Sequence, residues 1–442
     1  MGKRSNLALL FGLAAFAAFS FAGYLVLQPG PTDFAGGKTV SLDQYKGASP
    51  TGVPPELASA DLVKRGEYLA RAADCAACHT RAGGQAYAGG RAFDLPFGTI
   101  YTPNITSDKE TGIGAWSDAQ FLRAVHDGVG RSGERLYPAF PYPSYAMLTD
   151  DDVLAIKAYL LSLPPVRREN RPNTFVFPFN QRPLMAVWST FFNRAGIFRP
   201  RSDRSAEWNR GAYLVEAAGH CGECHTPRNL MQAMNTRRKF AGGEAENWKA
   251  YNITSDGSTG IGSWTDDELV EYLSKGFSPG RGAASGPMAE VVELSTSKLS
   301  PADVRAIVTY LRSIAGIHDR SLSPTITASV SPNPKTITDQ AIGLRVFQGA
   351  CASCHAWDGS ARLTPEAELI GARALRDPSG VNVALTILHG TGPRESSRPF
   401  MPSFGAYNDA EIAAVTNYVT SRFGSAPSSL AAGNVARLRA KN

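Results

Sequence analysis

The chain has 442 residues, a hydrophobic content of 43% and a formal net charge of +6. This length suggests about three domains of ordinary size, and the apolar fraction is that of a globular protein, which excludes an intrinsically disordered chain. The positive charge is too mild to indicate a nucleic-acid partner, and we expect none.

Residues 1–28 predict a membrane anchor or an export signal. Lys3 and Arg4 precede an uncharged run, Leu7 to Leu27, whose 21 residues are long enough to cross ~30 Å of hydrocarbon. A shorter apolar core ending at Ser20-Phe21-Ala22 would instead be typical of a cleaved signal peptide. We favour a retained transmembrane helix with its N-terminus in the cytoplasm, because the run continues past that site. Either way, we expect the rest of the chain on the periplasmic side of a bacterial inner membrane.

All six cysteines fall in one pattern, in which two cysteines separated by two residues are followed at once by histidine. The three copies, here called anchors 1, 2 and 3, are Cys75, Cys78 and His79; Cys221, Cys224 and His225; and Cys351, Cys354 and His355. A closed zinc site does not require the adjacent histidine, and a redox dithiol needs only the thiols. In c-type haem attachment all three residues have a role, because the cysteines form thioethers and the histidine is the proximal iron ligand. The pattern therefore predicts three covalently bound haem c groups.

Internal repeats divide the chain. NITSDKETGIGAW at 104–116 recurs as NITSDGSTGIGSW at 252–264, and RGEYL at 65–69 recurs as RGAYL at 210–214. With the anchors, these repeats predict cytochrome c domains at 58–167, 205–318 and 338–425, here called modules 1, 2 and 3. An aromatic linker at 168–204 either packs between modules or presents a surface to a membrane or partner, and a Pro/Ser-rich linker at 319–337 predicts an extended tether. In the repeated loops, four side chains either order the loop or hydrogen-bond haem propionates: Asn104, Thr106, Asn252 and Thr254.

A helix is predicted after each anchor, starting at the capping residues Thr149, Ser300 and Asn408. A tyrosine follows ten residues beyond each cap, at Tyr159, Tyr310 and Tyr418. The order helix, anchor, loop, helix is the plan of a small class I cytochrome c domain. We therefore expect an all-α fold of three tandem cytochrome c domains after an N-terminal transmembrane helix.

The sixth iron ligands are expected among the seven methionines, because a thioether opposite histidine is typical of electron-transfer haems. Met401 lies seven residues before the cap Asn408, which is the usual place, and Met288 lies twelve before Ser300. Module 1 departs from this pattern, because the position that corresponds to Met401 falls near Phe140 and not at a methionine. Met147 is the best thioether available there, and the alternatives are His126, a linker methionine such as Met185, or an open iron.

Longer segments resemble a known family over nearly the whole chain after residue 28. They are the three anchors, the NITSD loops, LYPAFPYPSY (136–145), SAEWNRGAYLVEAAGHCGECHTPRN (205–229) and MPSFGAYNDAEIAAVTNYV (401–419). These segments resemble the triheme cytochrome c subunits of bacterial membrane-bound dehydrogenases for alcohols, aldehydes, gluconate or sorbitol. The resemblance implies a catalytic subunit that carries molybdopterin, pyrroloquinoline quinone or FAD, and ubiquinone as the acceptor. Many relatives have AMPY at residues 139–142, where this chain has AFPY, so the resemblance leaves the sixth ligand of haem 1 open.

No segment of the sequence predicts substrate chemistry, since there is neither a GxGxxG after a strand nor a Walker sequence. We therefore expect electron transfer from a dehydrogenase subunit through three haems, with substrate oxidation on another chain. Two alternatives remain open. One is a multihaem peroxidase-like enzyme with an open haem 1, and the other is a stand-alone carrier to an oxidase.

Overall fold

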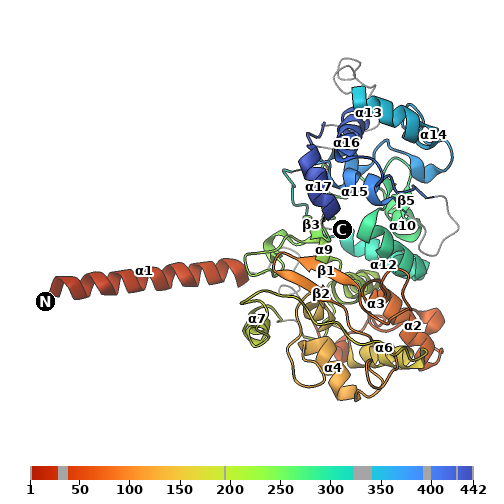
Figure 1. Ribbon diagram of the computed structural model, residues 1–442. Coiled ribbons are helices and arrows are strands. Elements are labelled where there is room, and N and C mark those ends of the chain that lie inside the picture. The colour runs from red at the N-terminus through yellow and green to blue at the C-terminus, as the bar shows by residue number, and fades with distance from the viewer. Residues whose placement is uncertain are drawn as a thin grey trace.

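The computed structural model describes residues 2–27, 38–193, 196–321, 341–391, 400–424 and 427–440. Helix α1 (Gly2–Leu27) projects from a body in which module 1 lies at one end, module 2 in the middle and module 3 at the other end (Figure 1). Most of the predicted Pro/Ser-rich tether lies outside the described residues. The three modules are therefore arranged in chain order along the body.

The predicted N-terminal transmembrane helix is wrong: no helix in the described ranges is long and apolar enough to cross a membrane. The run does form one helix, α1. The prediction rested on the absence of charge, which is a weaker criterion than apolarity. Ala, Gly and Ser supply eight of the fourteen residues between positions 11 and 24, and these small residues gain little from transfer into hydrocarbon.

Each module is organised around two helices that pack against each other. The pairs are α2 (Leu62–Ala72) with α6 (Asp150–Ser162), α8 (Ala206–Tyr213) with α12 (Pro301–Arg312), and α13 (Ala341–Val346) with α16 (Asp409–Phe423). One helix of each pair precedes the anchor and the other ends the module. The same helix pair thus recurs three times.

A glycine stands at each helix crossing because the two backbones leave no room for a side chain. A Cβ on Gly66 would lie 1.8 Å from the backbone oxygen of Ala155, and one on Gly211 would lie 1.8 Å from that of Ala306. The third crossing has Gly343 against Ala414, at 2.3 Å. The predicted tyrosines lie at the same three places, with the Cβ atoms of Tyr159, Tyr310 and Tyr418 within 3.0 Å of the added atoms.

The predicted helix starts are confirmed. The side chains of Thr149, Ser300 and Asn408 each accept a hydrogen bond from the backbone N–H three residues later. At Asn408 the side chain of Glu411 also accepts from the Asn408 N–H, which completes a capping box. Each cap satisfies a donor that the first turn of the helix leaves without an intrahelical partner.

Shorter elements complete the modules, the linker between modules 1 and 2, and the C-terminal segment. The helices are α3 (Cys75–His79), α4 (Asp118–Asp127), α5 (Tyr142–Tyr145), α7 (Leu184–Phe192), α9 (Gly222–His225), α10 (Asp266–Lys275), α11 (Gly286–Leu294), α14 (Ala352–His355), α15 (Val381–His389) and α17 (Ala432–Ala440). Two π-helical turns, η3 (Leu214–Ala218) and η7 (Phe347–Cys351), precede anchors 2 and 3.

The expectation of an all-α fold misses three two-stranded antiparallel sheets. They pair β1 (Ala92–Leu95) with β2 (Gly98–Tyr101), β3 (Gly243–Ala245) with β4 (Trp248–Ala250), and β5 (Phe277–Ser278) with β6 (Gly282–Ala283). The first two hairpins lead directly into the NITSD loops. Strands of two to four residues are too short to show an alternating pattern in the sequence, which is why the prediction missed them.

Modules 1 and 2 share one hydrophobic core, whereas module 3 has its own. Leu69 and Val153 of module 1 belong to the same buried cluster as Tyr213 and Ile307 of module 2. The second cluster contains residues of module 3 and the helix that follows it, among them Phe347, Ile412, Tyr418 and Val435. The first two modules are therefore one packing unit.

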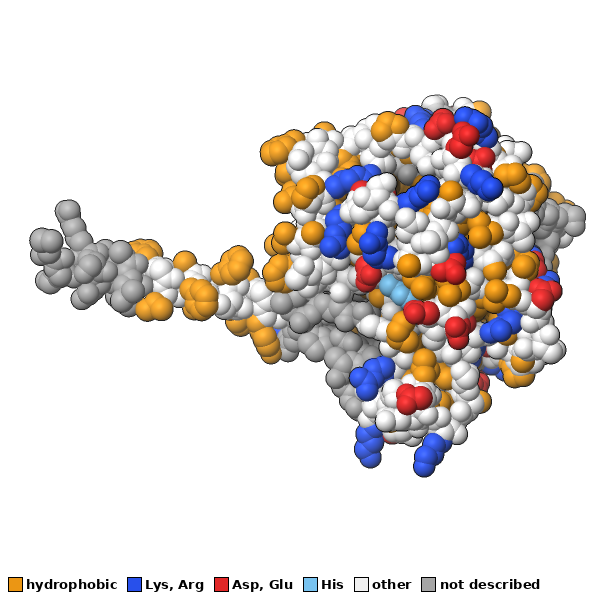
Figure 2. Space-filling model, turned by 90° about the horizontal axis from the view of Figure 1, so that it is seen from below, with side chains coloured by type: hydrophobic (Ala, Val, Ile, Leu, Met, Phe, Trp, Pro, Cys, Tyr) orange, Lys and Arg blue, Asp and Glu red, His pale blue; other side chains and the backbone are white. Residues whose placement is uncertain are grey.

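The aromatic linker is partly buried and partly exposed, and a role of its exposed side in binding a membrane or partner stays a prediction. Phe175, Trp188 and Phe198 are buried, and Trp188 joins a small cluster with Tyr142. The linker also exposes large apolar side chains: Val176, Phe177, Phe179, Leu184, Val187, Phe191 and Ile197. Its helix α7 lies on the side from which α1 projects (Figure 1), and hydrophobic side chains are exposed along that side (Figure 2).

Candidate functional site

Each anchor includes a short helix that ends at the histidine: Cys75 begins α3, whereas Cys221 and Cys351 directly precede α9 and α14. Within the described ranges, no group of three or more His, Cys, Asp or Glu side chains could hold a metal ion, so the cysteines do not form a closed zinc site. Burial raises the pKa of both Cys75 and Cys221 to about 12. A redox dithiol needs the opposite shift. The chemistry that fits the three pairs is thioether attachment.

The three anchor histidines make the same hydrogen bond. Their Nδ1 atoms lie 2.8, 2.6 and 2.6 Å from backbone carbonyl oxygens, which belong to Pro103, Tyr251 and Ala367 for His79, His225 and His355 respectively. A carbonyl only accepts, so Nδ1 donates its proton and Nε2 keeps a lone pair. Burial lowers the pKa of all three, that of His225 to about 4, so each ring is neutral at pH 7. Each histidine is thus in the tautomer that binds haem iron.

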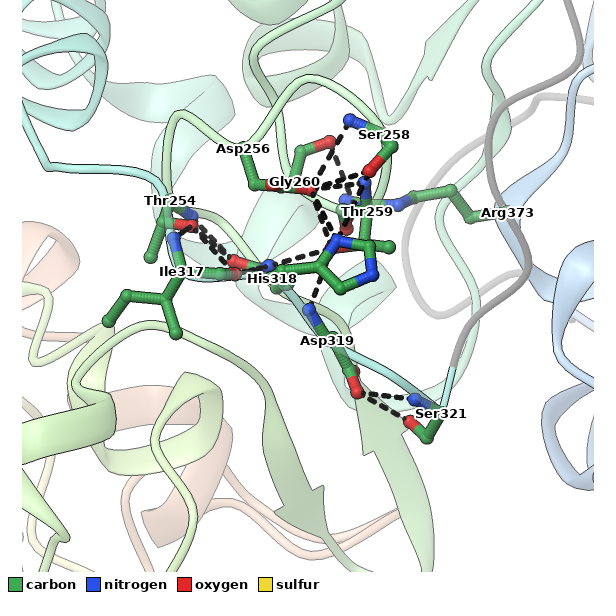
Figure 3. Close-up of polar contacts among 11 residues, drawn as sticks. Thr254, Asp256, Ser258, Thr259, Gly260, Ile317, His318, Asp319, Ser321 and Arg373 are labelled. Carbon is green, nitrogen blue, oxygen red and sulfur yellow. Dashed lines mark hydrogen bonds and ion pairs between the residues drawn. The ribbon is translucent and has the colours of Figure 1, made fainter.

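The NITSD loops are ordered by their own side chains. Asn252 donates from Nδ2 to the Ile317 carbonyl (2.6 Å) and to Thr259 (3.2 Å), and its Oδ1 accepts from the Thr254 N–H and hydroxyl (2.9 and 2.7 Å). Figure 3 shows the neighbouring bonds of the same loop, in which the Thr254 hydroxyl accepts from the Ile317 N–H and the Thr259 hydroxyl accepts from the Asp319 N–H. Both donors and both acceptor positions of this buried amide are therefore used.

The module 1 loop repeats this arrangement. Asn104 donates to the Val166 carbonyl (2.7 Å) and to Thr111 (3.1 Å), and it accepts twice from Thr106. Asn104 and Asn252 thus have no hydrogen-bonding capacity left for haem propionates. Of the two roles expected for these loop residues, loop ordering is confirmed.

The three candidate methionine ligands lie in different local structures. Met288 is in the first turn of α11, after a proline. Met401 exchanges two hydrogen bonds with Thr391. Met147 follows α5 and packs against the shared core. Their ligation of iron stays a prediction.

Two residues bear on the sixth ligand of haem 1. Phe140 packs against Tyr145, with 5.5 Å between ring centroids, and supplies no ligand atom. His126 lies in the last turn of α4, and its Nε2 is buried without a hydrogen-bond partner, so it stays available beside Met147 as a candidate.

Modules 1 and 2 are joined by two tyrosines that sequence reasoning missed. Tyr68 of module 1 donates to Asp303 (2.6 Å) and accepts from the N–H of Ser300 (3.1 Å), which is the cap of the last helix of module 2. Reciprocally, Tyr213 of module 2 donates to Asp152 (2.5 Å) and accepts from the N–H of the module 1 cap, at 3.3 Å. The sequence feature that could have indicated these tyrosines is their shared position in the repeats RGEYL and RGAYL. We call this interface the seam.

The chain segments just before anchors 1 and 2 meet at the seam. The Ala73 carbonyl accepts from the Tyr145 hydroxyl (2.7 Å), and the ring of Tyr145 packs edge-on against His220 at 5.3 Å. A Cβ on Gly219 would lie 3.9 Å from the Ala72 carbonyl. The attachment peptides of modules 1 and 2 are therefore neighbours.

Arg91 ties anchor 1 to module 2. Its Nη1 donates to the Ala77 carbonyl inside the anchor (2.6 Å) and to Glu290 (2.5 Å), and its Nη2 donates to Glu246 (2.8 Å). Glu290 is two residues beyond Met288 on α11. The helix with the candidate ligand of haem 2 is thus held against the anchor of haem 1.

Comparison with known proteins gives matches over most of the chain. The family model for cytochrome c matches residues 63–164 and 340–422. The chain is 43% identical to one subunit of the nicotinate dehydrogenase of Pseudomonas putida over 84% of its own length, and it spans 31% of that protein. It is 36% identical to the fructose dehydrogenase cytochrome subunit of Gluconobacter japonicus, covering 89% of this chain and 86% of the relative.

The alignment with a third relative also covers most of both chains. The chain is 38% identical to the gluconate 2-dehydrogenase cytochrome c subunit of Pantoea cypripedii, over 86% of this chain and 89% of the relative. The chain belongs to the family of cytochrome c subunits of dehydrogenases.

Proposed function

We propose that this chain carries three haem c groups and conducts electrons from the catalytic subunit of a dehydrogenase to ubiquinone. The observation that carries the proposal is the threefold recurrence of a buried anchor histidine whose Nδ1 donates to a backbone carbonyl. Family membership implies covalently bound haem c and electron transfer. The family model matches two segments, which contain anchors 1 and 3, and anchor 2 between them supports a third haem.

The residues have separate roles in this proposal. The six anchor cysteines hold the haems by thioethers, and His79, His225 and His355 are the proximal ligands. Met288 and Met401 are the opposite ligands of haems 2 and 3, and Met147 is the candidate for haem 1. Haem c supplies a one-electron ferric/ferrous couple, whose potential depends on axial ligand, burial and hydrogen bonding.

The order of electron transfer follows the packing of the modules. Anchors 1 and 2 are neighbours at the seam, so the haems that their cysteines and histidines would hold could pass electrons between modules 1 and 2. Module 3 reaches the other side of module 2, where β4 contacts α15. Haem 2 is therefore the middle carrier, and haems 1 and 3 are the two ends of the path.

The partner is a catalytic subunit that carries molybdopterin, pyrroloquinoline quinone or FAD. Three relatives named as subunits of nicotinate, fructose and gluconate dehydrogenases support a dehydrogenase partner for this chain. Substrate oxidation takes place on that partner. The haem domains lie on the periplasmic side of the bacterial inner membrane, because c-type haem is attached there and ubiquinone is held in that membrane.

Affinity purification tests this function directly. The tagged chain is isolated in mild detergent from the cell envelope of its host, and mass spectrometry identifies the proteins that stay bound. We expect a stoichiometric oxidoreductase subunit and a chain mass increased by three haems. A fully haem-loaded chain that purifies alone would contradict the dehydrogenase partner and favour a stand-alone carrier.

A further inference from the structure

Two arginines of module 3 lie where it meets module 2, and Arg376 is buried whereas Arg373 is half-buried. They begin and end the short turn η9 (Arg373–Arg376). Arg373 donates from Nη2 to the carbonyls of Thr259 and Gly260 in the second NITSD loop, the latter at 3.1 Å (Figure 3). Its guanidinium also lies 5.7 Å from the ring centroid of Tyr251. The arginines thus reach the loop that surrounds the haem 2 site.

Several donors of this group are buried without a hydrogen-bond partner. They are Nε of Arg373, Nε and Nη1 of Arg376, and the hydroxyl of Tyr251. Arg376 is only 8% exposed. A buried cation with unsatisfied N–H groups costs more free energy than most single interactions contribute. A ligand with several acceptor oxygens would satisfy all of these donors at once.

No acidic side chain neutralises the two arginines in the part of the chain that the structure describes. The nearby Asp377 is paired with Lys249 at 2.9 Å, and neither arginine forms an ion pair with an acid. Burial, followed by the proximity of Arg376, lowers the pKa of Arg373 to about 10. The group therefore favours an anionic ligand.

The group lies beside the iron ligand of module 2. The backbone carbonyl of Tyr251 accepts the Nδ1 proton of His225, so the residue that aligns this histidine also contributes its hydroxyl to the group.

We propose that Arg373 and Arg376 of module 3, together with Tyr251 of module 2, bind the propionate carboxylates of haem 2. A carboxylate matches the fork of a guanidinium and accepts from it through two oxygens. The two carboxylates would neutralise both arginines and accept from the four unpartnered groups. Module 3 thus completes the haem site of module 2. This inference rests on the proposed haem in module 2.

The propionates of haem 3 have the same chemistry and are the second possible source. The observations favour haem 2, because the partners of Arg373, namely Tyr251, Thr259 and Gly260, all belong to module 2, and the carbonyl of Tyr251 lies 2.6 Å from Nδ1 of His225. The two sources are separated by asking which haem potential responds to the arginines.

The test measures the reduction potential of each haem by spectroelectrochemistry of the intact chain with Arg373→Gln. Haem 3 is marked by Met401→His, because a second histidine lowers its potential and changes its spectrum. Removing a positive charge near an iron favours the ferric state, and Coulomb's law for a separation of ~10 Å at an effective dielectric constant of ~20 gives on the order of a tenfold change. That change lowers the potential of haem 2 by about 59 mV.

Three matched variants accompany this measurement. Arg437→Gln removes an exposed arginine from the C-terminal helix that packs on module 3, and it should leave the haem 2 potential unchanged. Arg373→Lys keeps the charge and should retain most of the potential. Tyr251→Phe removes one donor with little risk to folding, and it should shift the haem 2 potential down by less than Arg373→Gln.

The outcomes separate this proposal from the proposed function. A shift of haem 3 in place of haem 2, or equal potentials in Arg373→Gln and Arg437→Gln, would overturn the propionate site alone. If Arg373→Gln does not fold, an unchanged haem 2 potential in Tyr251→Phe overturns it equally. A native chain without haem at anchor 2 would overturn both proposals.

Discussion

The two interfaces of module 2 are built differently. The seam with module 1 combines a shared hydrophobic core with buried tyrosine–aspartate hydrogen bonds in both directions. The interface with module 3 is polar: Asn382 exchanges two hydrogen bonds with the backbone of Lys249, whose amine pairs with Asp377, and the two arginines of η9 lie nearby. The seam is therefore the interior of one folding unit, whereas module 3 is docked onto that unit.

The seam itself is not fully symmetric. Arg210 of RGAYL binds Asp303 through two hydrogen bonds (2.8 and 2.7 Å) and also donates to the carbonyls of Pro50 and Gly52. Its counterpart Arg65 in RGEYL has a buried Nε without a partner. The end of the seam at Asp303 thus has more hydrogen bonds than the other end. A substitution at Asp303 should therefore lower the free energy of unfolding most.

The largest effect is expected from Asp303→Ala. The substitution leaves Arg210 buried without its carboxylate, and breaking a buried pair costs about 3–5 kcal/mol. Denaturant unfolding, followed by tryptophan fluorescence and haem absorption, should show modules 1 and 2 losing stability together. Asp409→Ala is the control, because its pair with Arg439 is about one third exposed and contributes ~0–1 kcal/mol. Equal losses in the two variants would contradict the difference between the interfaces.

The two loop asparagines come next. Asn252→Ala and Asn104→Ala each remove four hydrogen bonds of a buried amide, with an expected loss of about 2–3 kcal/mol. Only the module 2 loop binds Arg373, so Asn252→Ala should also release module 3. Limited proteolysis between modules 2 and 3 measures that release. Cleavage that is equally fast in both variants would argue against a docked module 3.

The tyrosine hydroxyls are expected to contribute less. Tyr68→Phe and Tyr213→Phe each remove one buried donor, and each should lower the free energy of unfolding by about 1–2 kcal/mol. Tyr407→Phe in module 3 is the control with no expected loss. A reciprocal seam requires similar losses in the first two variants. If Tyr213→Phe proved silent while Tyr68→Phe did not, the reciprocal description would fail.

The smallest effect on the unfolding of modules 1 and 2 is expected from Lys249→Met. The lysine side chain is one third exposed but its partner Asp377 is buried and would lose its charged partner, so the loss of stability should fall on the docking of module 3. The variant should weaken the docking of module 3 without changing the unfolding of modules 1 and 2. Hydrogen exchange in β4 and α15 measures this directly. Faster exchange at the seam would contradict the separation of the two interfaces.

The sequence predicted the features that local chemistry decides. The anchors are contiguous motifs, and the caps at Thr149, Ser300 and Asn408 act within four residues. The contacts between modules were missed because they join positions far apart in the chain, such as Tyr68 with Asp303. The arginine pair Arg373 and Arg376 was missed for the same reason, since a buried arginine and an exposed one look alike in a sequence. The prediction that the N-terminal helix spans a membrane was wrong because the lack of charge was taken for apolarity.

One measurement tests the central claim most directly. The complex of this chain with its catalytic subunit is titrated anaerobically with the substrate of that subunit, and the absorption of reduced haem c is compared with full chemical reduction. The account predicts that substrate reduces three haems per chain. If the substrate is oxidised while the haems stay ferric, or if chemical reduction reveals fewer than three haems, the chain is not the electron path described here.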